Sequence, residues 1–205
     1  MAAMPTGQTT RADANRRRIL DVALTELLRD PDASMDQIAR AAGVVRRTVY
    51  GHFPSREALV GTLVDDAVEA VAAAHAAGCE GIEDPAEALA RSVLAVWEVA
   101  DRYRILVALA QRSVTVQGIR GRLAPVRETA AELLRRGLAQ GVFTSPLPAP
   151  ALAYVHEQTL IALMEAVNEG LLAPGEAGRS AAATVLTTAG VPASDATALA
   201  ARLNT

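Results

Sequence analysis

The stretch Met35–Leu59 constrains the fold more than any other part of this sequence. Apolar residues recur at helical spacing in two short runs, which predict helices over Met35–Ala42 and about Arg46–His52. Gly43 lies between the runs and suits a sharp turn, because glycine adopts backbone conformations that other residues avoid. Pro54 ends the second run, since proline cannot continue a helix. Two short helices joined by a tight turn form a helix-turn-helix.

Small and branched residues predict how these two helices pack. Ala39 would let the helices cross closely, and Val44 and Val49 would hold the second helix against the first. Ser34, followed three residues later by Gln37, has the pattern of a capping box at a helix start. This packing leaves the outer side of the second helix free to contact a partner.

Helical periodicity also covers the rest of the chain. Hydrophobic residues make up 51% of the sequence and are mostly Ala, Leu and Val; Ala and Leu are strong helix formers. No alternating strand pattern and no repeat occurs, so the predicted fold class is all-α. Gly78 and Gly81 are expected in a loop, and Pro146–Pro150 in a stiff connector. Further helices are expected from Arg11 to the stop at Asp30-Pro31-Asp32, from the Ser55 cap toward Ala74, behind the Asp84-Pro85 cap, and over Arg102–Arg112, Pro125–Gln140, Ala151–Glu169, Glu176–Ala189 and a short segment after Ser194.

Composition and motifs exclude several classes of protein. The single cysteine, Cys79, cannot form an internal disulfide, and no Cys/His cluster has zinc-ligand spacing. Met1–Thr10 lacks the apolar segment of a signal peptide, and no run is long enough to span a membrane. No nucleophile elbow, phosphate-binding glycine loop or metal-ligand helix motif is present. We therefore expect a soluble cytoplasmic protein that is not an enzyme, needs no cofactor or metal and does not bind a membrane.

Charge is distributed unevenly along the chain. The net charge is −3, but residues 1–60 hold nine Arg against seven acidic residues, and residues 61–205 hold eleven Arg against sixteen. A cationic N-terminal part joined to an acidic remainder suits a DNA-binding unit attached to a domain with another task. The chain has no lysine, and arginine suits bidentate contacts with phosphate and guanine.

The outward residues of the second short helix have the chemistry needed to read DNA. Arginine can bind the O6 and N7 atoms of guanine in the major groove, and threonine can meet a thymine methyl group or a phosphate. Phosphate contacts fix the register of a protein on DNA without reading its sequence. We expect base contacts from Arg46, Arg47, Thr48 and Gly51, and phosphate contacts from Ser34, Tyr50, His52 and Arg56.

The same stretch resembles the N-terminal domain of the tetracycline-repressor (TetR) family of regulators. The resemblance covers about Arg16 to Leu63 and rests on Ile38-Ala39, Ala42-Gly43-Val44, Thr48-Val49-Tyr50, His52-Phe53 and Ser55-Arg56-Glu57-Ala58-Leu59. Three residues on the reading face depart from the family pattern. Val45 replaces a small hydroxyl residue, Arg47 a glycine or small residue, and Gly51 a larger residue. These departures predict an operator that is specific to this chain and contains guanine.

The resemblance implies a division of labour along the chain. Residues 1–10 would be a mobile tail, residues 11–60 a three-helix DNA-binding domain, and residues 61–205 a helical domain that binds an effector and dimerises. The implied function is that of a sequence-specific transcriptional regulator, a repressor released from double-stranded operator DNA by a small molecule. Activation, a regulator without an effector and a scaffold that binds only proteins are the alternatives.

Two groups of residues are the candidates for the functions of the C-terminal domain. The two long C-terminal helices could pair across a two-fold axis as a four-helix bundle, or both could pack within one chain. The candidate dimer residues are Leu152, Val155, Leu163, Val167, Ala181 and Val185. Amphipathic residues on apolar helices often line small-molecule sites, although each is more often a core or surface residue. The candidate effector residues are Trp97, Tyr103, Gln111, Tyr154 and Gln158, whereas His75 and His156 are expected to be partly exposed.

Overall fold

The computed structural model describes residues 11–113 and 116–203, with side chains throughout these ranges except at residues 11 and 104–120. These described residues form helices and turns without any strand, which confirms the predicted all-α class. The expected tail, residues 1–10, lies outside the described residues. Within the described part of the chain, no helix combines the length and the apolar character that a membrane span requires.

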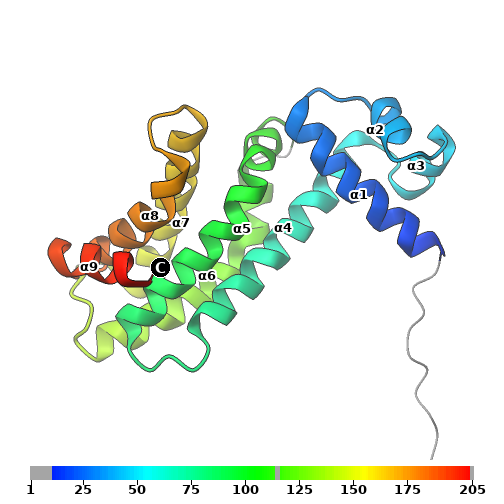
Figure 1. Cartoon of the computed structure of the whole chain (residues 1–205). Coiled ribbons are helices and arrows are strands. Elements are labelled where there is room, and N and C mark those ends of the chain that lie inside the picture. The colour runs from blue at the N-terminus through cyan, green and yellow to red at the C-terminus, as the bar shows by residue number, and fades with distance from the viewer. Residues whose placement is uncertain (1–10, 114–115, 204–205) are drawn as a thin grey trace, which may run out of the picture.

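Three helices form a compact group at one end of the molecule (Figure 1), which we call the head: α1 (Arg11–Arg29), α2 (Met35–Ala41) and α3 (Arg46–His52). The bounds agree with the predicted ones. The head has a hydrophobic core of its own, to which α4 (Arg56–Cys79) contributes its first turns. The largest fully buried side chains of this core are Ile19, Leu27, Ile38, Val49, Phe53, Leu59 and Val60.

Local hydrogen bonds fix the helix starts in the head. The hydroxyl of Ser34 accepts from the backbone N–H of Gln37 over 3.3 Å, and the Gln37 side chain accepts from the N–H of Ser34 over 2.7 Å. This is the capping box that the sequence predicts. Ser55 likewise accepts from the N–H of Ala58 over 3.1 Å and caps α4. Both caps satisfy N–H groups that a helix start leaves without partners.

The remaining helices form a bundle, which we call the body: α5 (Pro85–Ser113), α6 (Val116–Ala139), α7 (Ala149–Asn168), α8 (Pro174–Thr188) and α9 (Ala193–Leu203). Helix α4 runs from the head along α5, and α5 also packs against α6 and α8. Helix α6 packs on α7, and α8 on α9. The body has a second hydrophobic core, in which Leu134, Leu152, Val185 and Leu186 are fully buried.

Two helix predictions in the body are wrong. The helix after the Asp84 cap and the one expected at Arg102–Arg112 form a single helix, α5, because neither Gly nor Pro interrupts residues 86–113. Pro125, expected at a helix start, lies inside α6. Proline has no N–H to donate, so the carbonyl four residues earlier, at Gly121, cannot form its usual helical hydrogen bond. A helix can accommodate that loss when packing on its neighbours holds it in place.

Gly78 also differs from its predicted role. The sequence places it in a loop, but it lies inside α4, which continues to Cys79. A Cβ atom at Gly78 would lie 2.5 Å from Cα and 2.7 Å from N of Ser92 on α5. Glycine is therefore required because the backbones of α4 and α5 touch here, and not because the chain turns.

Candidate DNA-binding surface and ligand cavity

The turn between α2 and α3 is built by backbone hydrogen bonds around Gly43. Gly43 has a positive φ of 64°, a conformation that favours glycine. Its N–H donates to the carbonyl of Arg40 over 3.1 Å, and the N–H of Val44 donates to the carbonyl of Ala39 over 3.0 Å. Ala39 and Val49 are buried where the two helices meet. The corner thus has the packing that its sequence predicts.

This packing places one side of α3 in solvent. Arg46, Arg47 and Gly51 are exposed and Thr48 is half-buried, whereas Val49 has no exposed surface. Val45 caps α3 without a side-chain hydrogen bond and is 69% exposed. The four residues expected to read bases therefore belong to the exposed helix α3, which the head core supports from behind.

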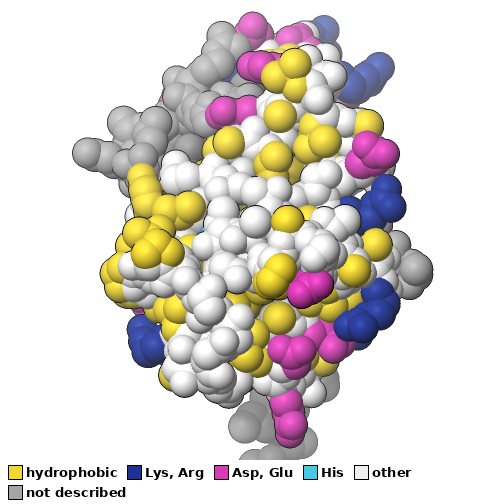
Figure 2. All heavy atoms as spheres, turned by 90° about the vertical axis from the view of Figure 1, so that its left-hand side faces the viewer, with side chains coloured by type: hydrophobic (Ala, Val, Ile, Leu, Met, Phe, Trp, Pro, Cys, Tyr) yellow, Lys and Arg dark blue, Asp and Glu magenta, His cyan; other side chains and the backbone are white. Residues whose placement is uncertain are grey.

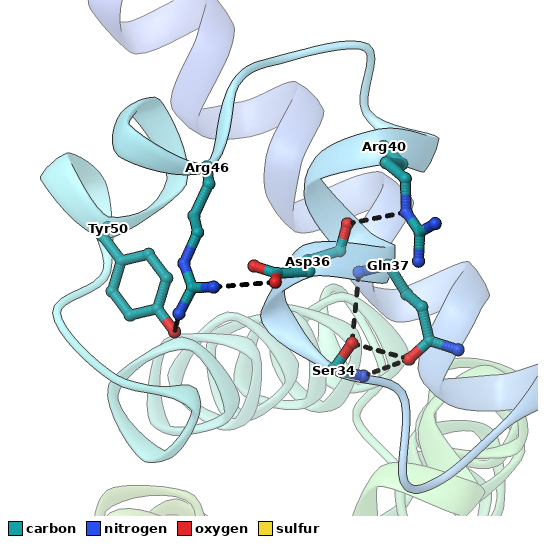
Figure 3. Close-up of polar contacts among 6 residues, drawn as sticks. All are labelled: Ser34, Asp36, Gln37, Arg40, Arg46 and Tyr50. Atoms are coloured by element: carbon teal, nitrogen blue, oxygen red, sulfur yellow. Dashed lines mark hydrogen bonds and ion pairs between the residues drawn. The ribbon is translucent and has the colours of Figure 1, made fainter.

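Arg46 is held by two neighbours (Figure 3). Its Nη1 lies 2.8 Å from Oδ2 of Asp36, and its Cζ lies 5.1 Å from the centroid of the Tyr50 ring. Its Nη2 also lies 3.4 Å from the Tyr50 hydroxyl. The ion pair is solvent-exposed and is worth at most about 1 kcal/mol. The Arg46 side chain is thus oriented in the free protein, but it can leave Asp36 and Tyr50 at a small cost in free energy.

The residues expected to contact phosphate have different neighbours. The Ser34 hydroxyl is exposed but engaged in the capping box. Tyr50 is 37% exposed, and half-buried His52 lies beside Phe53 with 6.3 Å between ring centroids. Arg56 donates to the carbonyls of Pro31 and Ala33. Arg56 therefore anchors the loop between α1 and α2 in the free protein.

Helix α1 contributes two residues that the sequence analysis did not single out. The Arg18 guanidinium donates to the carbonyls of Ala42 and Gly43, and the Arg16 guanidinium lies 5.4 Å from the centroid of the Phe53 ring. Both thereby attach α1 to the helix-turn-helix. The run of three arginines at residues 16–18 was the available signal, but their partners are 24 or more residues away along the chain.

A cavity of about 180 Å³ lies where α4 to α8 meet. Most of its lining is aliphatic, from residues such as Val64, Val93, Leu160 and Met164. Two of the predicted effector residues, Trp97 and Tyr103, line it. Tyr154 and Gln158 do not: Tyr154 is exposed, and the Gln158 side chain donates to Glu157. The Gln111 side chain lies outside the described residues.

The two histidines predicted to be partly exposed are instead buried at this cavity. His75 is 8% exposed and His156 is 6% exposed, and both line the cavity. Burial lowers the pKa of His75 and lowers that of His156 to about 4, because desolvation disfavours the charged imidazolium. Both rings are therefore neutral at pH 7. Sequence periodicity could not reveal this, because their burial comes from packing between helices.

An ion pair completes the polar lining. Nη1 of Arg127 on α6 lies 2.5 Å from Oε2 of Glu157 on α7, and the two side chains are 24% and 12% exposed. Both residues line the cavity. The two opposite charges balance each other, so the cavity wall combines apolar side chains, two neutral imidazole rings and one ion pair.

The predicted dimer residues separate into two sets. Leu152, Ala181 and Val185 have no exposed surface within one chain, and Val167 has only 7%. These four belong to the core of the body, so their side chains are not available to a second protomer, and the prediction needs correction for them. The pattern of small apolar residues had the alternative explanation of packing within one chain. Val155 and Leu163 keep part of their surface exposed.

The head has the architecture of a helix-turn-helix DNA-binding domain, and comparison with known proteins shows which family it resembles. Residues 19–63 match the family model described as bacterial regulatory proteins, tetR family. The head and the first turns of α4 are thus similar to the DNA-binding domain of TetR-family regulators. The transcriptional regulator EthR of Mycobacterium tuberculosis is 40% identical over 72 residues, which is 33% of each chain. TtgW of Pseudomonas putida is 52% identical over 44 residues, 20% of this chain and 33% of its own.

Solved structures extend the likeness of fold to the body. RolR in complex with resorcinol has a TM-score of 0.66 and 23% identity, over 95% of this chain and 97% of its own. LfrR of Mycobacterium smegmatis in complex with proflavine has a TM-score of 0.68 and 22% identity, over 87% of this chain and 98% of its own. The chain matches the curated relatives over only a third of their length. The solved structures show a shared fold over most of the chain.

Proposed function

We propose that this regulator is a homodimeric repressor that leaves its operator when a small molecule binds in the cavity of the body. In this proposal residues 11–60 bind DNA and residues 61–205 carry the effector site and the dimer interface. The observation that carries the proposal is the exposed outer side of α3, where Arg46 and Arg47 stand on a helix that the head core fixes. Such a helix fits the major groove.

Arg46 and Arg47 have different starting states for this task. Arg46 must exchange its contacts with Asp36 and Tyr50 for contacts with a base, whereas no hydrogen bond or ion pair of Arg47 occurs among the described contacts. Thr48 would meet a phosphate or thymine methyl group, and Gly51 would allow close approach. Tyr50, His52, Ser34 and Arg56 would provide phosphate contacts, the last two only after giving up local hydrogen bonds.

An uncharged stripe on α7 supports a dimer interface. Its members recur at helical spacing and keep part of their surface exposed: Ala151, Tyr154, Val155, Gln158 and Ala162. On the end of the body that α8 and α9 form, hydrophobic side chains are widely distributed, and most charged side chains lie toward the top, bottom and right of the view (Figure 2). Pairing across a two-fold axis would place two copies of α3 about one turn of DNA apart, roughly 34–36 Å. Ala162→Arg should convert the dimer to monomers in sedimentation analysis, and a persistent dimer would move the interface elsewhere.

The cavity has a direct structural route to the head. Val64 on α4 is buried in the head core and also lines the cavity, and Val68 and Tyr103 pack against the same core and line the cavity. A ligand that displaces these side chains would shift α4, and with it the head. Coupling of this kind is typically worth about 1–3 kcal/mol, or roughly 5–150-fold in DNA affinity. The resorcinol and proflavine complexes of proteins with this fold support a small-molecule effector.

The first test is binding of the full chain to DNA that flanks its own gene, measured by fluorescence anisotropy at several salt concentrations. A duplex of scrambled sequence is the control. The proposal requires tight, sequence-dependent binding that weakens steeply with salt, because phosphate contacts release counterions. Equally weak binding to both duplexes would contradict an operator at this position, and the absence of any salt-dependent affinity for DNA would favour a protein-binding scaffold.

The second test assigns the reading residues. Arg47→Ala should cost about 1–3 kcal/mol and relax the preference at one base pair, and Arg46→Ala should cost less, because Arg46 loses contacts with Asp36 and Tyr50 on binding. The matched control is Arg135→Ala, which removes an exposed arginine of the body. A uniform loss across all sequences would show that these arginines contact only phosphates.

A further inference from the structure

The cavity is large enough for a single ring with small substituents. Its volume is about 180 Å³, and an apolar protein cavity of roughly 150 Å³ is known to admit benzene. Trp97 and Tyr103 line it together with aliphatic residues. Aromatic side chains bind an aromatic ring by edge or offset contacts that add to the hydrophobic effect.

One polar atom in the wall has an unmet hydrogen bond. His156 is 6% exposed and lines the cavity, and its Nε2 atom is buried without a hydrogen-bond partner. Buried polar atoms are nearly always paired, because leaving one unpaired costs about 1–3 kcal/mol. The other cavity histidine, His75, differs because its ring has a hydrogen bond with the backbone at Thr129.

Charge at the cavity is already balanced. Arg127 and Glu157 pair with each other at 2.5 Å, and both cavity histidines are neutral because burial lowers their pKa values. A charged ligand would lose its hydration and would have to break the Arg127–Glu157 pair to find a partner. Burying an unpaired charge in this way is strongly unfavourable.

We infer that the cavity binds an uncharged, single-ring aromatic compound with a hydroxyl group that hydrogen-bonds to Nε2 of His156. A hydroxyl group both donates and accepts, so it satisfies either neutral tautomer of the imidazole. The aliphatic side chains and Trp97 enclose the ring. This inference rests on the proposed function only in treating the cavity as the effector site.

The test compares three probes that share a methyl-substituted benzene ring, toluene, para-cresol and para-toluate, by titration calorimetry with the full chain. The wild-type protein should bind para-cresol and toluene, and should bind para-toluate most weakly. His156→Phe keeps a ring at this position but removes both nitrogen atoms. It should weaken para-cresol roughly tenfold and leave toluene within about twofold, since only the hydrogen bond is lost.

Thr25→Val is the control, because it removes a hydroxyl from an exposed residue of the head that does not line the cavity, and it should change neither affinity. Circular dichroism checks that each variant is folded. An equal loss for both ligands in His156→Phe, an unchanged para-cresol affinity, or tightest binding of para-toluate would overturn the inference.

DNA binding measured in parallel separates this inference from the proposed function. If para-cresol binds as expected but operator affinity stays constant, the ligand class holds and the effector role fails. If the protein binds its operator and none of the probes, the ligand class fails and the DNA-binding function stands.

Discussion

The head presents its candidate functional side chains on its surface, whereas the body holds its candidates in its interior. In the head, the core supports a surface, and the charged groups Arg46 and Arg47 project from α3 into solvent. In the body, the helices surround a largely apolar cavity, and the buried side chains of His75 and His156 line it as neutral rings. Positive charge favours binding of a surface to phosphate, whereas a largely apolar cavity disfavours an unpaired charge. The proposed sites therefore suit two different kinds of ligand, although both are built from similar helices.

The largest expected effect on stability comes from replacing a glycine of the body, in comparison with a glycine of the head. Gly78→Ala should lower the free energy of unfolding by about 3 kcal/mol, because the new Cβ would overlap the backbone of Ser92. Gly51→Ala is the control: a Cβ there meets nothing within 4 Å, so alanine should stabilise α3 by about 0.5–1 kcal/mol. Urea denaturation measures both. Equal effects would mean that α4 and α5 can separate without cost.

The next effect is a pH dependence of stability that we expect from the buried histidines of the body. Burial lowers the pKa of His156 from its ordinary value of 6.5 to about 4 in the folded protein. The free energy of unfolding is therefore unaffected by this histidine above pH 6.5. It falls as the pH decreases from 6.5 toward 4, because the unfolded chain takes up the proton first. The loss should reach roughly 3 kcal/mol, and His75 adds to it in the same direction.

His156→Phe should flatten this pH dependence, and Thr25→Val should leave it unchanged. Denaturation at a series of pH values provides the measurement. A His156→Phe profile as steep as that of the wild-type protein would assign the acid sensitivity to other groups and would remove the contrast between neutral cavity and charged surface.

A smaller effect concerns the head alone. Ser34→Ala should cost about 1 kcal/mol of stability, because the first turn of α2 loses the capping hydrogen bond to the Gln37 N–H. Ser34→Asp keeps a capping group and should restore stability. Because a carboxylate repels phosphate, Ser34→Asp should also weaken DNA binding if this position lies at the DNA. Stability restored without any change in DNA binding would confine Ser34 to the cap.

The smallest effect concerns the connection between the regions. Nε of Arg122 on α6 lies 2.6 Å from Oδ1 of Asp65 on α4, and the Asp65 side chain is 59% exposed. Arg122→Gln should therefore cost only roughly 0.5 kcal/mol of stability. If α4 transmits effector binding, the variant should nevertheless change the fold-reduction of DNA affinity that the effector causes. An unchanged reduction would show that this ion pair has no part in the coupling.

The sequence by itself determined the all-α class, the two helices and turn of the helix-turn-helix, the caps at Ser34 and Ser55, and the exposed outer residues of α3. These features depend on residues at most a few positions apart, so helical spacing, capping patterns and glycine conformation are sufficient to predict them. DNA-contact roles for Arg46, Arg47, Thr48 and Gly51 stay predictions.

Only the tertiary structure decided how the body is arranged. It buried His75 and His156 at one cavity, paired Arg127 with Glu157, and placed Leu152, Ala181 and Val185 inside the core of a single chain. It also showed that Gly78 serves a close helix contact and that Pro125 lies within α6. Each of these features depends on which helix faces meet, and apolar periodicity shows that a face is buried without showing against what. The cavity exists because helices distant in sequence meet around it.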